Sequence, residues 1–272
     1  MVNMILATLL SWYSFFNITP FSSNATEELY YNGNPATVAE VEFLSAVSGA
    51  YWDRDSRLAE VNYFNKRFNV DFVFYNFGNF KYSGNFPVDD ISITYSAFAY
   101  KFAVGYALAL DKNLYFGIQP QYHRFEYYNQ KADGFTFNTG LFHKLPPIHL
   151  HYGIFLRNFG LSSSEGYNFP GTLNLDIGYS PHSKVMLYYR YVRNVSDGAL
   201  GIFGEGVNHE ISARYDYRGM VKPSISLYMG DDLRVGTVSI KVNTSGRLFV
   251  LYDFTYRTNG FGPIHMITVG VE

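Results

Sequence analysis

The sequence predicts an all-β protein, a closed antiparallel transmembrane β-barrel of about 14 strands. Apolar and polar residues alternate in windows of about ten residues, the length of a tilted strand that crosses a bilayer. Short and long connections alternate between these windows. Aromatic residues make up 19% of the 272 residues and charged residues only 16%, whereas soluble domains carry about 25% charged residues.

Alternation with a period of two residues defines each strand. In one window, His209, Ile211 and Ala213 fall on one face, while Glu210 and Ser212 fall on the other. The apolar window 91–97 is assigned to a loop, because single-chain bacterial barrels have an even number of strands. The predicted strands cover 37–47, 57–66, 69–79, 98–110, 113–126, 134–143, 148–158, 170–179, 183–193, 206–217, 222–229, 233–242, 246–257 and 262–272.

The connections support a barrel that crosses a membrane. Every second connection is short, and most of the others are long, as expected for periplasmic turns and outer loops. The longer connections are 48–56, 80–97, 127–133, 159–169 and 194–205. A soluble β-sandwich is the alternative, but it gives no reason for this alternation. In lipid, an apolar outer face requires every backbone group to be paired, which a closed sheet achieves.

The N-terminal region predicts export. The apolar run Met4 to Phe16 is too short to span a membrane as a helix and has the length of a signal-peptide core. Ser23-Asn24-Ala25 resembles a cleavage site. We therefore expect a signal peptide over 1–25, an N-terminal segment over 26–36 and a barrel over 37–272, located in the bacterial outer membrane.

Composition and motifs argue against several functions. The net charge of −2 gives no support to a nucleic-acid partner, and the absence of cysteine excludes thiolate sites. His149-x-His151 would place two rings on one strand face without an evident third ligand, so we expect no metal and no cofactor. None of the seven histidines is followed two positions later by serine, and no Gly-x-Ser-x-Gly elbow occurs. We therefore expect no enzyme.

Several short motifs follow one another along the chain, and their order matters more than any one of them. They are Asn34-Pro35-Ala36, Phe77-Gly78-Asn79-Phe80, a hairpin made of Phe102-Ala103-Val104-Gly105-Tyr106-Ala107, the turn Asp111-Lys112-Asn113 and Gly117-Ile118-Gln119-Pro120-Gln121-Tyr122, then Leu156-Arg157-Asn158-Phe159-Gly160 and Phe169-Pro170. Together they resemble the PorV/PorQ family, a branch of the barrels related to the FadL long-chain fatty acid transporters. The resemblance implies an outer-membrane barrel with an N-terminal segment in the lumen. The sequence departs from the family pattern at Gln121, where a lysine is usual, and at the non-aromatic last residue, Glu272.

Two groups of residues are candidates for a functional site. The first is a hatch formed by Gly33, Asn34, Pro35 and Ala36, which would act as a gate or, as we favour, as a fixed plug. It would lie beside the small residues Ala103, Gly105, Ala107 and Ala109. The second group would line the lumen, either to bind a polar head group or as a neutralised network: Gln119, Gln121, His123, Arg190, Glu210, Arg214 and Asp253.

Three functions follow from these expectations. The resemblance to the fatty acid transporters implies transport of a hydrophobic or amphipathic small molecule. The PorV/PorQ resemblance alternatively implies a docking component for secreted proteins, as in type IX secretion. An outer-membrane hydrolase is a third hypothesis, which the missing motifs disfavour. The expected partners are outer-membrane lipids and either a hydrophobic ligand or a secreted protein.

Overall fold

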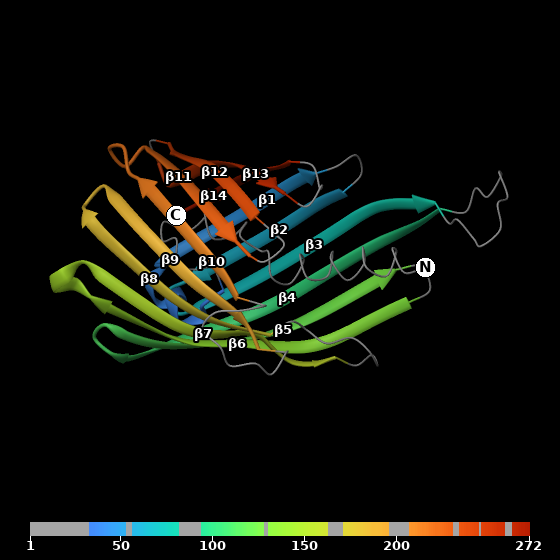
Figure 1. Cartoon of the computed structure of the whole chain (residues 1–272), viewed down its shortest axis with the longest axis horizontal. Helices are drawn as coiled ribbons and strands as arrows, with labels where there is room; N and C mark the ends of the chain where they lie inside the picture. The colour runs from blue at the N-terminus through green and yellow to red at the C-terminus, as the bar shows by residue number, and fades with distance from the viewer. Residues whose placement is uncertain are drawn as a thin grey trace.

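A computed structural model describes residues 33–52, 56–81, 94–127, 130–162, 171–195, 207–230, 234–244, 246–258 and 263–272. Fourteen strands in these residues form a closed barrel in which each strand pairs with its sequence neighbour (Figure 1). The strands are β1 (Phe43–Trp52), β2 (Ser56–Asn65), β3 (Phe68–Lys81), β4 (Thr94–Asp111), β5 (Leu114–Tyr127), β6 (Gln130–Leu145), β7 (Leu150–Ser162), β8 (Thr172–His182), β9 (Val185–Asn194), β10 (Val207–Tyr215), β11 (Val221–Met229), β12 (Arg234–Asn243), β13 (Leu248–Arg257) and β14 (Ile264–Val271).

The first and last strands close the barrel. β1 pairs antiparallel with β14 from Ser45 opposite Val271 to Trp52 opposite Ile264. Ser48 Oγ and Thr268 Oγ1 form a hydrogen bond of 2.8 Å across this seam. The sheet therefore has no free edge, as the sequence predicts, and its backbone groups are paired without water.

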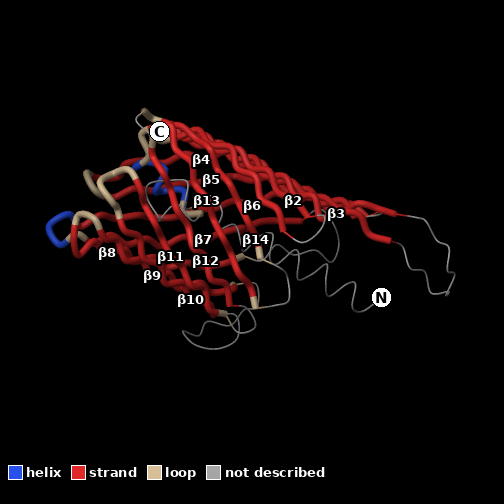
Figure 2. The backbone as a smooth tube through the Cα atoms, turned by 90° about the horizontal axis from the view of Figure 1, so that it is seen from above, coloured by secondary structure: helices blue, strands red, loops and turns tan. Residues whose placement is uncertain are grey.

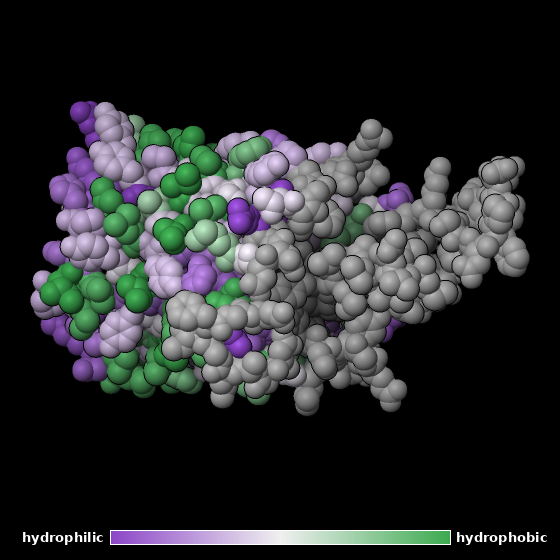
Figure 3. All heavy atoms as spheres, viewed as in Figure 1, coloured by the Kyte–Doolittle hydropathy of each residue, from purple (hydrophilic) through white to green (hydrophobic). Residues whose placement is uncertain are grey.

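The two faces of the wall have opposite chemistry. Val47, Phe102 and Ile267 are among many exposed apolar side chains on the outer face, whereas Gln119 and Asp253 are among the polar side chains buried on the inner face. Figure 3 shows hydrophobic residues along the wall and hydrophilic residues at the end where the short turns lie. A β-sandwich would bury its apolar faces against each other, so this alternative is wrong. No helix in the described residues is long and apolar enough to span a membrane.

The prediction for the first strand is wrong in position. Residues 37–47 were expected to be strand, but Pro35–Glu40 forms a 3-10 helix, η2, and β1 begins only at Phe43. Asn34 caps η2 and Pro35 begins it, because the fixed φ of proline suits a helix start. The connection expected at 48–56 consequently shrinks to 53–55. The expected signal peptide, 1–25, and residues 26–32 lie outside the described residues.

The loop assignment of window 91–97 is also wrong in part. Thr94 to Ala97 continue β4, which has 18 residues, whereas β10 and β11 have nine each. The number of strands stays even because the window extends an existing strand. Consequently the wall formed by β3 to β6 is taller than the opposite wall (Figures 1 and 2).

A substitution at Gly270 tests the packing at the seam between β1 and β14. A Cβ atom on Gly270 would lie 2.5 Å from Cζ of Phe249 and 2.8 Å from the carbonyl oxygen of Ser45. We expect Gly270→Val to lower the free energy of unfolding by about 1–3 kcal/mol, because the side chain overpacks the inner face. Urea unfolding in detergent micelles, followed by tryptophan fluorescence, measures this change.

Gly236 supplies the matched control. It lies in β12, and a Cβ atom there would meet nothing within 4 Å. Gly236→Val should leave the unfolding midpoint unchanged. An equal loss of stability in both variants would contradict the packing described at the seam.

Candidate functional site in the barrel lumen

The helix η2 packs against the inner face of the wall. Asn34, Ala36 and Val38 are fully buried. A Cβ atom on Gly117 of β5 would lie 2.2 Å from the backbone nitrogen of Ala36 and 2.2 Å from the carbonyl carbon of Pro35. Only glycine permits so close an approach of two backbones, so Gly117 provides the surface on which η2 lies.

Asn34 fixes the start of η2 to β6. Its Oδ1 accepts a hydrogen bond of 3.1 Å from the backbone N–H of Ala36, and its Nδ2 donates one of 3.1 Å to the carbonyl of Leu141. Gly140 and Gly153 leave room for this amide, because Cβ atoms there would approach it within 2.5 Å and 2.8 Å. The side chain thus satisfies a helix terminus and joins it to the wall.

The motif at 156–160 lies beside the N-terminal segment that contains Gly33 and Asn34. Gly33 has a φ of 93°, and a Cβ atom there would lie 3.3 Å from Cδ and Nε of Arg157. Asn158 has a φ of 54°, and its backbone N–H donates to Oδ1 of Asn138 over 2.8 Å beside a register shift between β6 and β7. The four predicted hatch residues, Gly33 to Ala36, are therefore brought together with Gly117 and Arg157.

Apolar side chains surround η2 at the turn end of the lumen. Ala36 packs in a cluster with Phe142 and Tyr188. Val38 packs in a second cluster with residues of β1, β2, β4 and β13, and Glu40 forms an ion pair with Lys144. Residues from both sides of the barrel therefore meet around η2. The second cluster consists of Val38, Leu44, Ala46, Phe64, Ala107, Phe249 and Leu251.

A network of amide side chains lines the wall next to η2. Oδ2 of Asp71 accepts hydrogen bonds from Nε2 of Gln119 at 2.7 Å and from Nδ2 of Asn69 at 2.8 Å. Oε1 of Gln119 accepts from Nε2 of Gln121 and from Nδ2 of Asn138, both at 2.9 Å. Hydrogen bonds therefore join inner polar side chains of β3, β5 and β6 to one another.

His123 extends this network. Its Nε2 lies 2.7 Å from Oγ1 of Thr136, which also donates a hydrogen bond of 3.3 Å to Oε1 of Gln121. Gln119, Gln121 and His123, all predicted to face the lumen, therefore lie on one inner surface.

Arg190 is the centre of a second, charged cluster. Its Nε and Nη2 donate to the two carboxylate oxygens of Asp176 at 2.7 and 3.2 Å, and its Nη1 donates to Oε2 of Glu210 at 3.3 Å. The guanidinium carbon lies 5.5 Å from the ring centroid of Phe155 and 5.3 Å from that of Tyr188, whose hydroxyl it also contacts. Two carboxylates and two rings thus hold one buried cation.

Arg214 and Asp253 lie apart from both clusters. Arg214 is half-buried near the turn end of β10, and no hydrogen bond or ion pair joins its side chain to another described residue. Asp253 is buried in β13, opposite Ser239 and Met266.

Sequence reasoning missed several inward polar residues. Glu60 and Asp71 are buried on the inner face, and Asp176 holds Arg190. In β2, Glu60 shares its face with Leu58 and Phe64, so a simple contrast of polar and apolar faces did not identify it. Its even spacing from Leu58 and Phe64, which places it on the same face of a strand, is the sequence signal that could have found it.

The outer end of the lumen is lined by a further apolar cluster. Tyr75, Ala99 and Phe125 lie there beside strand ends remote from the short turns. On the inner face of β1 to β5, together with β14, an apolar layer at the outer end is therefore followed by a polar layer and then by η2 at the turn end. The full cluster is Ala50, Leu58, Val73, Tyr75, Ala99, Phe125, Ile264 and Met266, with Phe77 packed against it.

The two histidines of His149-x-His151 do not share a strand face as expected. His149 is exposed and follows the 3-10 helix η3 (Pro146–Ile148) with a φ of 53°, whereas His151 is buried in β7. Two prolines shorten the strand at this turn. Among the described residues, no group of three histidine, aspartate or glutamate side chains could hold a metal.

Known proteins resemble this chain in structure rather than in sequence. No protein-family model and no curated protein sequence matches it. The CymD monoaromatic hydrocarbon channel superimposes with a TM-score of 0.59 at 9% identity, covering 94% of each chain. The Pseudomonas putida toluene transporter TodX gives 0.58 at 9% identity, covering 88% of this chain and 91% of that one. A FadL homologue of Pseudomonas aeruginosa gives 0.56 at 9% identity, covering 95% of each.

These likenesses establish the fold. Because the sequence identity is only about 9%, the likeness shows a shared fold: the closed barrel of bacterial outer-membrane proteins. The predicted fold class and the outer-membrane character of the barrel are confirmed.

Gly117→Ala tests the seating of η2. The added methyl group would lie 2.2 Å from backbone atoms that cannot rotate away, so we expect η2 to be displaced at a cost of about 1–3 kcal/mol. Hydrogen exchange of residues 33–40 should become faster than in the parent protein. Gly49→Ala is the control, because a Cβ atom on Gly49 meets nothing within 4 Å. Unchanged exchange in Gly117→Ala would argue against the contact.

Arg190→Met tests the charged cluster. Removing the cation leaves Asp176 and Glu210 together without their shared partner, so we expect a loss of about 3–5 kcal/mol in unfolding free energy. Arg124→Met is the control, because Arg124 pairs with Glu126 on the outer face, where partly exposed pairs contribute little. Denaturant unfolding in micelles should separate the two variants. Similar midpoints would mean that the Arg190 cluster does not stabilise the barrel.

Proposed function

We propose that this protein is a non-enzymatic outer-membrane barrel of PorV/PorQ type that carries a hydrophobic or amphipathic small molecule across the outer membrane. The observation that supports this most is the layered lumen. An apolar layer with Tyr75, Ala99 and Phe125 lies at the outer end, and a polar layer with Asp71 and Gln119 follows it. An amphipathic molecule likewise has an apolar part followed by a polar part.

The apolar layer would receive the hydrocarbon part of the ligand. Binding sites for such molecules are mostly apolar, with a few polar groups that fix orientation. Here the polar groups belong to rigid strands and are held by hydrogen bonds to one another. They therefore offer a preorganised surface to a polar head group.

The segment 26–36 would act as a luminal plug. Its described part, Gly33 to Ala36, is held by Asn34 and by the backbone contact at Gly117. This supports the fixed plug over the gate. A ligand entering from the outer end would then leave past η2 or through the wall. The signal peptide over 1–25 remains a prediction.

The structural neighbours agree with this class of ligand. They include a monoaromatic hydrocarbon channel and a toluene transporter. We extend to this chain only the hydrophobic character of the cargo and the absence of catalysis. An outer-membrane hydrolase is the least favoured function, since neither the sequence motifs nor the neighbours suggest one.

A docking component for secreted proteins is the second candidate. The observation that favours it is the gathering of the PorV/PorQ-like motifs around η2, with Asn34, Gly117 and Arg157 brought together. This supports the finer family assignment independently of the fold. The partner would be a secreted protein bound at the outer loops, most of which lie outside the described residues.

Uptake of a labelled probe tests transport. Cells lacking the protein, cells with the parent chain and cells with Ala99→Phe are given radiolabelled toluene or oleic acid. Ala99 is buried in the apolar layer, so its enlargement should reduce uptake severalfold by filling the ligand path. Ala59→Phe is the control, because Ala59 faces outward on β2. A heat-dependent shift in electrophoretic mobility confirms that both variants fold.

The result also separates the two candidates. Equal uptake with and without the protein would exclude transport of these probes. Recovery of a secreted protein with the parent chain, unaffected by Ala99→Phe, would then favour docking.

A further inference from the structure

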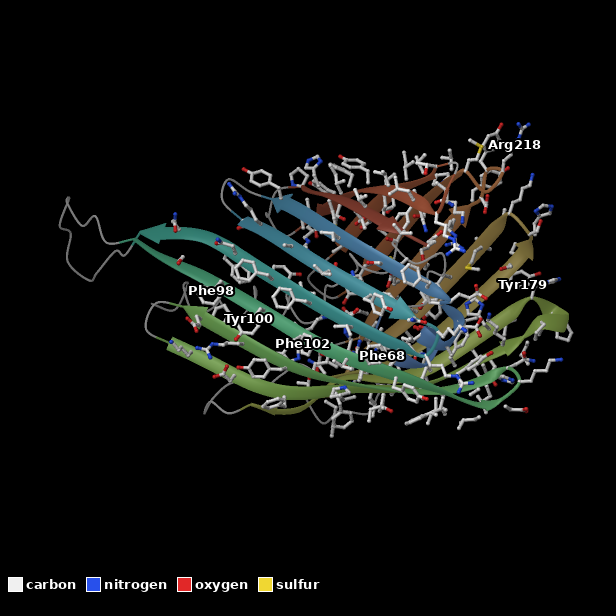
Figure 4. The ribbon with its side chains drawn as sticks, turned by 180° about the vertical axis from the view of Figure 1, so that it is seen from behind. Phe68, Phe98, Tyr100, Phe102, Tyr179 and Arg218 are labelled. Carbon is white, nitrogen blue, oxygen red and sulfur yellow. The ribbon has the colours of Figure 1, made fainter. Side chains whose placement is uncertain are left out.

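The short turns form a ring of positive charge at one end of the barrel. Five of the six short connections between strands carry lysine or arginine, and the sixth follows Lys144 at the end of β6. Asp216 is the one acidic residue within these connections. Figure 4 shows Arg218 at this end, directed away from the wall. The cations are Lys66, Arg67, Lys112, Lys184, Arg218 and Arg247.

These cations do not neutralise nearby acids. Three acidic residues at this end have other partners: Glu40 pairs with Lys144, Glu272 pairs with Lys241, and Asp216 accepts from the backbone N–H of Gly219 and lies 3.9 Å from Nζ of Lys222. Within the described residues, none of the six turn cations forms an ion pair. Asp111 and Glu42 are the other acids at this rim, and Oδ1 of Asp111 accepts a hydrogen bond from the backbone N–H of Lys112.

The charge is specific to this end. The chain has a net charge of −2, and the connections at the opposite end contain nine acidic residues against one arginine. The acids are Asp53, Asp55, Asp89, Asp90, Glu165, Asp197, Glu205, Asp231 and Asp232, and the arginine is Arg54. A general excess of surface lysine therefore does not account for the ring.

Four of the five cationic turns lie next to exposed apolar side chains of the outer face. Phe68 follows Arg67, Leu110 precedes Lys112, and Leu248 follows Arg247, and all three are exposed. Arg218 lies over the ring of Tyr217, with its guanidinium carbon 5.3 Å from the centroid. The apolar side chains would contact acyl chains, so the neighbouring cations would lie at the level of the lipid head groups.

We propose that this ring binds the phosphate groups of anionic phospholipids in the periplasmic leaflet. Short turns face the periplasm in barrels of this type, and basic residues near a membrane surface attract anionic lipids. The cations are distributed over hairpins around the whole circumference, from β2–β3 to β12–β13. A surrounding shell of lipid matches this distribution, whereas a single protein partner would contact one side.

Lipid retention by the full-length protein tests the proposal. The parent chain, reconstituted in equal amounts of phosphatidylglycerol and phosphatidylcholine, is extracted in mild detergent, and its bound lipids are counted by native mass spectrometry. We expect phosphatidylglycerol to be enriched and the enrichment to disappear at high salt. A variant with Lys66, Arg67, Lys112, Lys184, Arg218 and Arg247 changed to glutamine should lose roughly tenfold or more of the preference.

Arg57→Gln/Lys131→Gln/Arg234→Gln is the control, because these exposed cations lie toward the opposite end. It should keep the lipid preference, and the mobility shift on heating establishes that every variant is folded. Equal retention of the two lipids by the parent chain, or an undiminished preference in the sixfold variant, would overturn the proposal. Displacement by inorganic phosphate would identify a free-anion site instead. Binding to an acidic periplasmic protein without any lipid preference would also overturn it.

Discussion

The pairing of every backbone group in a medium without water is the constraint on which this structure depends. Hydrocarbon offers no hydrogen bonds, so a sheet that faces it cannot leave an edge unpaired. The seam between β1 and β14 meets this requirement over eight residue pairs. The hydrocarbon surroundings also reverse the distribution of side chains found in soluble proteins. Apolar residues lie on the outside of the barrel, and polar residues must be accommodated inside.

The interior therefore has to satisfy its own polar groups. In one network the amides of Asn69 and Gln119 donate to the carboxylate of Asp71, and in the cluster around Arg190 opposite charges pair. Close backbone contacts supply the remaining packing. Gly117 and Gly140 allow η2 and Asn34 to lie directly on the wall. The same features that stabilise the barrel thus shape the lumen that we propose as a ligand path.

The fold was largely predictable because period-2 alternation reports directly which residues share a face. From β2 onward the expected strands match the observed ones to within a few residues, apart from the early start of β4. The strand prediction failed at residues 37–42, because Asn34 and Pro35 begin a 3-10 helix over Pro35–Glu40. The helix start fixed by the Asn34 cap and Pro35 determined the structure there, and the apolar residues that follow did not.

The site was predictable only in part. The inward positions of Gln119, Gln121 and His123 follow from the alternation, and the pairing of Arg190 with Glu210 would follow once the register is known. Asp176 was not identified, because its partnership depends on the register between β8 and β9. Register is set by contacts between strands, which a single sequence does not display.

The unequal heights of the walls give the barrel an oblique rim. β4 and β6 have 18 and 16 residues, whereas β10 and β11 across the barrel have nine each. The long strands extend beyond the short ones on one side of the entrance, and their outer surface carries neighbouring rings such as those of Tyr122 and Phe135, whose centroids lie 5.1 Å apart. A molecule diffusing in from the side of β10 and β11 meets the lower edge first, so this geometry gives the entrance a preferred direction of approach.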